Sequence, residues 1–482
     1  MRNIRLLFVT LIISAFAFQG CEDMDDTAVP VNDFIWKGLN LYYLWQAEVP
    51  ELADDRFPTQ QALNNYLEGF ASPETLFQNL LYKPGEIDRF SVLFADYRVL
   101  ENRLQGIAKS NGVEYGLVFA DESETTIFGY VRYILPDSDA ASKDIQRGDI
   151  FYAVDGTNLT VDNYRELLGQ DTYTLNLADY NDGALTPNGE SVMLTKTEYA
   201  ENPVNTTNVI MQDGHTIGYL MYNGFYSTYD EELNAAIGQL ASQGIDELVL
   251  DLRYNSGGSV RTATYLASMI TGQFEGQLFS RQQWNNKLQD YYDNNNPEAL
   301  INKFAGQLSN GATINHLNLN KVYILTTRST ASASELIING LQPYIDVVVI
   351  GDTTTGKNVG SVTLYDSQDF SRNNVSGNHT YAMQPIVLRI VNVNNFGDYS
   401  NGIAPDIQIR EDYGNLGMLG SPDEPLFAAA IADITGNGRF GVPFTDDRHK
   451  LFKDSKNIRR FGTEMYIEDV PVGGFNLIKN LN

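Results

Sequence analysis

Cysteine, histidine and basic side chains are all scarce in this sequence of 482 residues. The single cysteine, Cys21, excludes a disulfide within the chain and a cysteine-rich zinc site. The four histidines are scattered without metal-ligand spacing (His215, His316, His379, His449), so the sequence predicts no metal site and no cofactor. Lys and Arg number 33 against 61 Asp and Glu, a net charge of −28 that would repel nucleic-acid phosphates. Nucleic-acid binding is therefore not expected.

Long apolar runs are also missing, except for one at the N-terminus. Two arginines precede an almost unbroken apolar run from Leu6 to Phe18, which is short for a membrane span and typical of a signal-peptide core. The run ends in Phe18-Gln19-Gly20-Cys21, which resembles a bacterial lipoprotein cleavage box. The resemblance implies a signal peptide over residues 1–20 and a lipid on Cys21. An ordinary secretory signal with an incidental cysteine is the alternative.

An acidic stretch, Glu22-Asp23-Met24-Asp25-Asp26, follows this cysteine. It resembles the surface-export signal of lipoproteins from the Bacteroidetes lineage, and residues 21–32 are interpreted as a tether. The predicted location is the cell envelope, with the chain anchored to the outer membrane by lipid alone. The sequence leaves open which leaflet holds the lipid.

Residues 33–103 are predicted to form a helical N-terminal domain. Asp33 is a plausible N-cap for an apolar helix that stops before Pro50. A second helix is expected around residues 63–70, and Ser72-Pro73 is a start signal for a third.

Residues 104–198 change to short β-type runs separated by turns. The run Tyr115-Gly116-Leu117-Val118-Phe119 and the later Arg147-Gly148-Asp149-Ile150 together resemble a PDZ domain, with a helix over residues 160–168. The resemblance implies that Tyr115, Gly116, Leu117 and Val118 form a loop that holds a terminal carboxylate while the peptide adds a strand to the sheet. An unrelated small β domain is the alternative.

Strands and helices alternate over residues 199–412, which predicts an α/β core. Strands are expected at residues 217–221, 247–252, 322–325 and 346–350, and helices at 231–241, 258–269 and 333–341. A polar stretch over residues 274–318 is interpreted as an insertion, and residues 413–482 as a C-terminal extension.

Three motifs in this core could carry chemistry. Asp251-Leu252-Arg253-Tyr254-Asn255-Ser256-Gly257-Gly258 follows a strand, and its glycines let backbone N–H groups face a ligand. Thr330-Ala331-Ser332-Ala333-Ser334-Glu335 opens a helix, whose N-terminus favours a developing oxyanion. Each also has a purely structural interpretation: a strand–turn–helix junction for the first, and an S-x-x-E capping box for the second.

The third motif, residues 351–358, approaches the phosphate-binding pattern G-x-x-x-x-G-K-[ST]. Asn358 stands where that pattern needs a hydroxyl for Mg²⁺, and residues 359–365 are β-like where a helix should follow. Nucleotide binding is therefore not favoured.

Taken together, the motifs resemble the carboxy-terminal processing (tail-specific) serine proteases over residues 105–410, with Gly402-Ile403-Ala404-Pro405-Asp406 as a further family mark. The resemblance implies an α/β core related to the ClpP/crotonase folds and a Ser–Lys dyad of Ser332 and Lys357. It also implies an oxyanion hole formed by Ala333 and Gly258. Ser361 stands where the family has a glutamine that supports the lysine.

A lysine can act as a base only when it is neutral. Lowering its pKa from about 10.4 to about 7 costs roughly 4.6 kcal/mol, which burial can supply. We therefore expect an extracytoplasmic serine endopeptidase that captures unstructured C-terminal polypeptide tails. Lys357 could instead be a solvated lysine in a surface loop. The protein could likewise be an inactive surface peptide-binding protein on the same scaffold.

Overall fold

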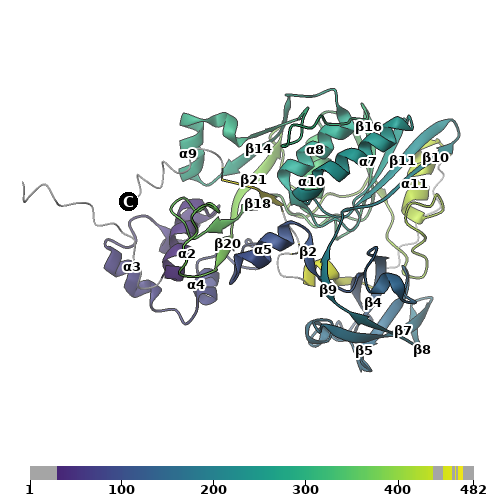
Figure 1. The fold of residues 1–482 in the computed structure, drawn as a ribbon, viewed down its shortest axis with the longest axis horizontal. Helices are drawn as coiled ribbons and strands as arrows, with labels where there is room; N and C mark the ends of the chain where they lie inside the picture. Colours follow the sequence, from purple (N-terminus) through teal and green to yellow (C-terminus); the bar gives the residue numbers. More distant parts are fainter. Residues whose placement is uncertain (1–29, 438–448, 459–461, 463–464, 471–482) are drawn as a thin grey trace, which may run out of the picture.

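A six-stranded sheet lies at the centre of the α/β core (Figure 1). The computed structural model describes residues 30–437, 449–458, 462 and 465–470, so the predicted signal peptide and Cys21 lie outside the described residues. The strand order is β10 (Val204–Gln212), β11 (His215–Tyr222), β12 (Glu247–Asp251), β16 (Lys321–Thr326), β17 (Asp346–Gly351) and β22 (Ile407–Gln408). β10 is antiparallel to β11, and the other neighbours pair in parallel. The predicted alternation of strands and helices is confirmed.

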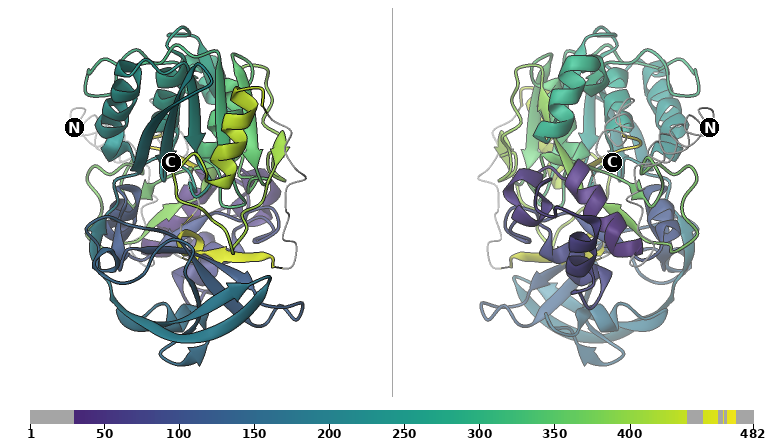
Figure 2. Two further views of the ribbon diagram at one scale, coloured as in Figure 1. Left: turned by 90° about the vertical axis from the view of Figure 1, so that its right-hand side faces the viewer. Right: turned by 90° about the vertical axis from the view of Figure 1, so that its left-hand side faces the viewer.

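Helices cover both faces of this sheet. One face carries α7 (Asp230–Ser242), α8 (Val260–Thr271) and α10 (Ala333–Leu341), whose apolar side chains share one buried cluster with strands β11, β12 and β16. The opposite face carries α11 (Pro425–Ile434), the yellow helix in the left view of Figure 2. Its Phe427 ring lies 4.8 Å from the Tyr219 ring of β11. Part of the predicted C-terminal extension is thus a layer of the core.

A second, mixed sheet has six strands in the order β13 (Gly258–Ser259), β24 (Met465–Ile467), β18 (Val359–Val362), β21 (Ile386–Asn392), β14 (Leu278–Trp284) and β15 (Ile301–Lys303). β14, β15, α9 (Asn286–Asn295) and η5 (Pro297–Leu300) all come from residues 274–318. The interpretation of that polar stretch as a mere insertion was wrong. Phe279 and Trp284 of β14 are buried in the main hydrophobic cluster, and Ser280 to Trp284 pair with β21.

The N-terminal part is helical, as predicted, and it packs on the core. Its helices are α2 (Pro30–Tyr42), η1 (Gln46–Glu48), η2 (Pro50–Leu52), α3 (Gln60–Leu67), α4 (Pro73–Asn79) and α5 (Tyr97–Leu104). Asp33 does not cap α2, because the helix already begins at Pro30, and Asp33 instead pairs with Lys37 at 2.8 Å. The Ser72 cap is confirmed, since its hydroxyl accepts from the Thr75 N–H at 3.2 Å. Strand β1 (Val92–Phe94) joins β20 (Ala382–Gln384) and β19 (Leu364–Tyr365) of the core.

The β-rich domain forms one sheet, drawn at the lower right of Figure 1. Its order is β23 (Leu451–Asp454), β3 (Val113–Phe119), β4 (Ile127–Ile134), β5 (Ile150–Val154), β7 (Thr172–Asn181) and β8 (Ala184–Thr195), with β6 (Thr157–Asn158) on β5. It also contains η3 (Ala140–Ser142) and α6 (Tyr164–Leu167), and β2 (Ile107–Ser110) pairs with β9 (Thr197–Ala200) beside it. The predicted loop of Tyr115, Gly116, Leu117 and Val118 was wrong: these residues lie inside β3, which pairs with β4 on one edge and with β23 on the other.

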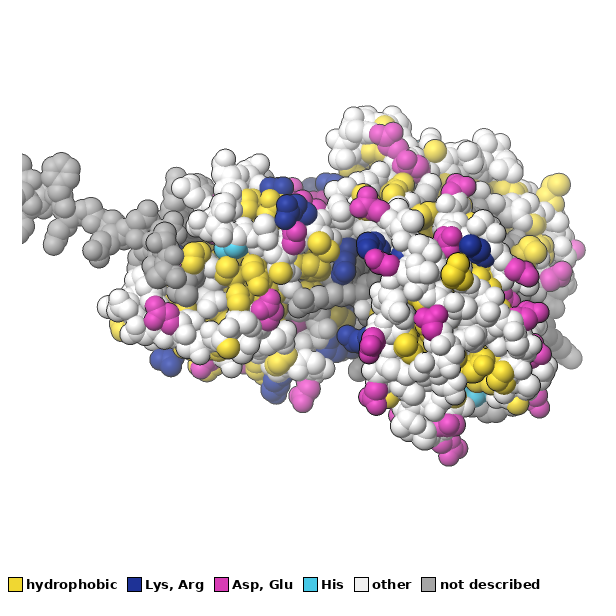
Figure 3. Space-filling view, turned by 60° about the horizontal axis from the view of Figure 1, so that its bottom comes forward, with side chains coloured by type: hydrophobic (Ala, Val, Ile, Leu, Met, Phe, Trp, Pro, Cys, Tyr) yellow, Lys and Arg dark blue, Asp and Glu magenta, His cyan; other side chains and the backbone are white. Residues whose placement is uncertain are grey.

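The face shown in Figure 3 reflects the excess of acidic residues and has no dominant basic patch. Acidic side chains are dispersed over that face, and basic side chains lie in small groups between them. Over the described ranges, the molecule contains no helix with the length and apolar character needed to cross a bilayer.

Candidate active site

The three sequence motifs meet because they follow three adjacent parallel strands. The loops after β12, β16 and β17 all leave from the carboxyl edge of the central sheet, which is where ligands bind in open α/β sheets. Hydrogen bonds join the loops directly. The Ala331 N–H donates to the Asn255 carbonyl at 3.1 Å, and the Thr355 N–H donates to the Thr330 carbonyl at 2.9 Å.

Ser332 is the N-cap of α10 and is completely buried. Its backbone has φ +65° and ψ −116°, a region that normally requires glycine. Non-glycine residues held there cost about 1–3 kcal/mol and occur mainly at functional sites. One half of the predicted capping box is present, since the Ser332 N–H donates to the Glu335 carboxylate, but the hydroxyl oxygen of Ser332 has no hydrogen-bond partner among the described residues.

Lys357 lies in the loop between β17 and β18 and is also completely buried. Its Nζ is 4.7 Å from the centre of the Phe90 ring, which comes from the N-terminal part of the chain. The neighbouring Arg89 donates to the Gly356 carbonyl at 2.7 Å. Burial disfavours an ammonium ion and favours the neutral amine. A solvated loop position for Lys357 is thus excluded.

The Glu335 carboxylate ties the serine to the lysine. Its Oε2 accepts the backbone N–H of Ser332 at 2.7 Å and of Lys357 at 2.8 Å. Its Oε1 accepts the Gly356 N–H at 2.7 Å and the Thr354 hydroxyl. Burial raises the pKa of Glu335, and these four donors oppose that rise. Sequence reasoning treated Glu335 only as a helix cap and missed this link.

Two backbone N–H groups were predicted to form an oxyanion hole. Ala333 is the first residue of α10, so its N–H belongs to the helix turn that has no partner within the helix. Gly258 lies in β13 with φ +141°, and a Cβ there would stand 2.3 Å from the Phe225 carbonyl oxygen. Only glycine fits this approach. The segment before Gly258 is joined to the start of α10, because the Asn255 carbonyl also accepts from the Ser334 hydroxyl at 3.1 Å.

Comparison with known proteins shows to which family the chain belongs. Residues 216–409 match the domain of peptidase family S41, and residues 30–92 match the peptidase S41 N-terminal domain. The chain belongs to peptidase family S41. The match to the S41 domain contains Ser332, Lys357, Gly258 and Glu335.

Relatives within the S41 family include carboxyl-terminal-processing proteases. The chain is 25% identical to one from Picosynechococcus sp. PCC 7002 over 62% of its own length, and 23% identical to one from Synechocystis sp. PCC 6803 over 63%. The alignments span 65% and 64% of those relatives. A crystal structure assigned to the S41 proteases, from Bacteroides fragilis NCTC 9343, superposes with a TM-score of 0.65 at 27% identity, covering 84% of this chain and 97% of that one.

A buried ion-pair network anchors the first S41 motif. Arg253 is completely buried and pairs with Asp251 at 2.8 Å and with Glu424 at 2.5 Å. Its carbonyl accepts a hydrogen bond from the Thr327 hydroxyl, five residues before Ser332. Sequence reasoning missed this network because Glu424 lies outside the motifs, more than 170 residues along the chain.

Ser361, the predicted support for the lysine, is buried in β18, and its hydroxyl donates to the Met465 carbonyl of β24 at 3.2 Å. Its role beside Lys357 stays a prediction. Strand β24 itself was not predicted. It lies between β13, which carries Gly258, and β18, which begins two residues after Lys357.

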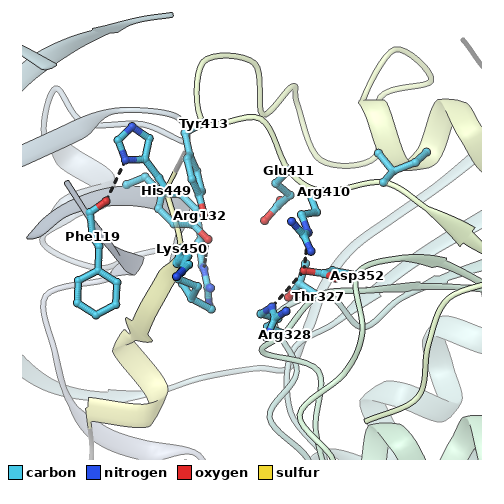
Figure 4. Close-up of a pocket in the computed structure, with 13 residues that line it drawn as sticks. Phe119, Arg132, Thr327, Arg328, Asp352, Arg410, Glu411, Tyr413, His449 and Lys450 are labelled. Atoms are coloured by element: carbon cyan, nitrogen blue, oxygen red, sulfur yellow. Dashed lines mark hydrogen bonds and ion pairs between the residues drawn. The ribbon is translucent and has the colours of Figure 1, made fainter. Parts of the chain in front are cut away.

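A cavity of about 400 Å³ lies where the β-rich domain meets the S41 core (Figure 4). Figure 4 shows Arg328 and Arg410 turned toward Asp352 on one side and His449 on the other. Neither Ser332 nor any other predicted catalytic residue lines this cavity. It is a feature of the domain junction and is separate from the serine and the lysine.

Proposed function

We propose that the chain is a serine endopeptidase in which Ser332 is the nucleophile and Lys357 is the general base. One observation carries the proposal: a single buried carboxylate, that of Glu335, fixes the backbone of both residues. No histidine is needed, because a buried lysine is held toward its neutral, basic form. The names of the relatives add support.

In this mechanism, neutral Lys357 takes the proton of the Ser332 hydroxyl while Oγ forms a bond to the substrate carbonyl carbon. The oxyanion forms against the N–H groups of Ala333 and Gly258. The C–N bond then breaks, Lys357 returns its proton to the leaving amine, and an acyl-enzyme ester remains on Ser332. Water, activated by the same amine, hydrolyses the ester.

The β-rich domain would act as a PDZ-like module that captures polypeptide tails by strand addition, and the core would be related to the ClpP/crotonase folds. Strand β3 and helix α6 support this assignment, because a strand edge facing a helix is the arrangement that accepts an added peptide strand. The substrate class is therefore unstructured polypeptide with a free tail.

Export and lipid attachment at Cys21 are part of the proposal. The chain would then act outside the cytoplasm, held to the outer membrane by lipid. Labelling of growing cells with an alkyne fatty acid should mark the wild-type chain and leave Cys21→Ala unmarked. Equal labelling of both would reject lipid attachment at this cysteine.

The enzymatic part is tested with purified protein and an unfolded polypeptide such as reduced, alkylated casein. Wild type should cleave it, and Ser332→Ala and Lys357→Ala should each lower the rate at least 10³-fold, the scale known for nucleophile and base deletions. Retained cleavage by both variants would reject the dyad.

A second candidate function is peptide binding without turnover. The observation in its favour is that the Ser332 hydroxyl has no hydrogen bond in the described structure, to Lys357 or to any other group. Catalytic hydrogen bonds of an unliganded site often tighten only when substrate binds. Tail-peptide binding without cleavage and without acylation of Ser332 would establish the second function.

A further inference from the structure

The strand edge that should receive a substrate tail is already covered by the chain's own C-terminal segment. β23 pairs antiparallel with β3, with Leu451 opposite Val118 and Asp454 opposite Gly116. The Phe119 N–H donates to the Lys450 carbonyl at 3.0 Å, which extends the pairing by one residue. In a strand-addition site, these main-chain bonds are the ones that a peptide ligand would make.

An aromatic side chain anchors this segment in the slot between β3 and α6. The ring of Phe452 lies 5.1 Å from the ring of Phe119 on β3 and 5.3 Å from the ring of Tyr164 on α6. It packs against the buried core of the β-rich domain, as does Ile458. Because β23 has a bulge at this residue, Phe452 can turn into the slot while its neighbours stay paired.

Beyond the anchor, charged side chains of the segment reach the S41 core. The Asp454 carboxylate accepts from the Ser329 hydroxyl at 2.6 Å and lies 3.4 Å from Arg132 of the β-rich domain. Lys456 donates to the Asn223 carbonyl at 2.5 Å. Ser329 is three residues before Ser332. The segment thus joins the tail-binding domain to the loop of the nucleophile.

The same C-terminal region also supplies a strand to the mixed sheet. β24 pairs in parallel with β13 through Gly258–Met465 and with β18 through Ser361–Tyr466. Met465 is completely buried, and the Tyr466 hydroxyl donates to the Leu104 carbonyl at 3.3 Å. A strand of the chain itself therefore separates the strand of the predicted oxyanion glycine from the strand that follows the lysine.

We propose that the described C-terminal residues 450–458 and 465–470 are an intramolecular ligand that holds the protease in a self-occupied state. This inference rests on the proposed function of the β-rich domain and deepens it, because it names the regulation of the same site. Residues 450–455 occupy the tail-binding edge, and β24 occupies the gap between β13 and β18. A substrate tail must displace them before it can bind.

The tethered segment has a large competitive advantage. A ligand on the same chain acts at an effective concentration of about 1 mM, so a free peptide with the same intrinsic affinity is excluded until it approaches that concentration. Weakening the tethered copy alone should therefore raise the apparent affinity for a free peptide. The increase equals the factor by which the fraction of chains with an open site rises.

The experiment measures peptide binding in a Ser332→Ala background, so that cleavage cannot interfere. The probe is a fluorescein-labelled peptide with the sequence of residues 449–458, followed by fluorescence anisotropy. Phe452→Ala in the full chain should bind it at least 10-fold more tightly than the chain with Phe452 intact, and Phe452→Leu should lie between them. Met211→Ala is the control, because Met211 is an exposed side chain of β10, outside the C-terminal segment and the β-rich domain, and it should leave binding unchanged.

If β23 is instead a permanent structural strand, Phe452→Ala and Phe452→Leu will lower the unfolding temperature and neither will gain peptide binding. That result, or equally tight binding by the chain with Phe452 intact, overturns the proposal. Failure of the proposed function has a different signature. In that case the chain with native Ser332 never cleaves casein, while the gain in peptide binding on Phe452→Ala is still observed.

Discussion

Ser332 and Lys357 donate their backbone N–H groups to one carboxylate oxygen, Glu335 Oε2, at 2.7 and 2.8 Å. The two residues are 25 positions apart, and the carboxylate that joins them is fully buried. The relative position of the proposed nucleophile and the proposed base therefore depends on a third side chain, and this dependence can be measured.

Removing that carboxylate should uncouple the pair. Glu335→Ala leaves three buried N–H groups without their acceptor, each at a cost of about 1–3 kcal/mol. We expect a loss of several kcal/mol in the free energy of unfolding and a fall in kcat of at least 100-fold. Glu335→Gln keeps one carbonyl acceptor, so its free energy of unfolding and its kcat should both lie between those of the wild type and those of Glu335→Ala. Urea unfolding and steady-state cleavage of a peptide check this, and a Gln variant as impaired as Ala would show that acceptor geometry is not the cause.

The left-handed backbone of Ser332 predicts an unusual stability order. Glycine adopts φ +65° without strain, whereas serine and alanine do not. Ser332→Gly should therefore be more stable than Ser332→Ala by about 1–2 kcal/mol, and both should be inactive. Equal unfolding free energies of the two variants would show that the site stores no strain.

The ring of Phe90 lies over the Lys357 amine, with 4.7 Å between Nζ and the ring centre. Phe90→Ala replaces the ring by water, which solvates an ammonium ion more strongly than a ring face does, so the amine should be protonated more readily at neutral pH. The rate of cleavage at pH 7 should fall about 10-fold and recover as the pH rises, since the amine then loses its proton. Phe396→Ala, an exposed ring, is the control. A loss that is the same at every pH would assign Phe90 a packing role only.

Much of the fold followed from local pattern. α10 begins at Ala333 and ends at Leu341 as predicted, and four strands of the central sheet, β11, β12, β16 and β17, were placed within one to two residues, whereas β10 and β22 were not predicted. Such elements are determined by apolar periodicity and by capping residues, and both can be recognised within a short stretch of sequence.

What the sequence could not predict depends on contacts between distant segments. β24 has three residues and is formed because β13, some 200 positions earlier, leaves an edge open to it. Tyr115 to Val118 resembled a loop because of Gly116, yet the side chain missing there makes room for the Tyr130 ring of β4. Glu335 matched a capping pattern, and that local role concealed the acceptor that Lys357 uses.

Asp230, at the start of α7, should make stability depend on pH. Burial raises its pKa from 3.8 to about 6, against a hydrogen bond from Thr262. The folded state therefore holds the proton more tightly, so this contribution is complete below about pH 4 and is lost as the pH rises through 6, by up to roughly 3 kcal/mol. Asp230→Asn should remove this dependence in urea unfolding from pH 4 to 7, and exposed Glu166→Gln should not. Parallel curves for wild type and Asp230→Asn would contradict the assignment.

The central claim is that Lys357 activates the Ser332 hydroxyl. The most direct measurement is intact-protein mass spectrometry after treatment with a fluorophosphonate, followed by peptide mapping. The account predicts one adduct on Ser332 in the wild type, none in Ser332→Ala, and labelling at least 100-fold slower in Lys357→Ala. Labelling of Lys357→Ala at the wild-type rate, or an adduct on a different serine, would contradict it.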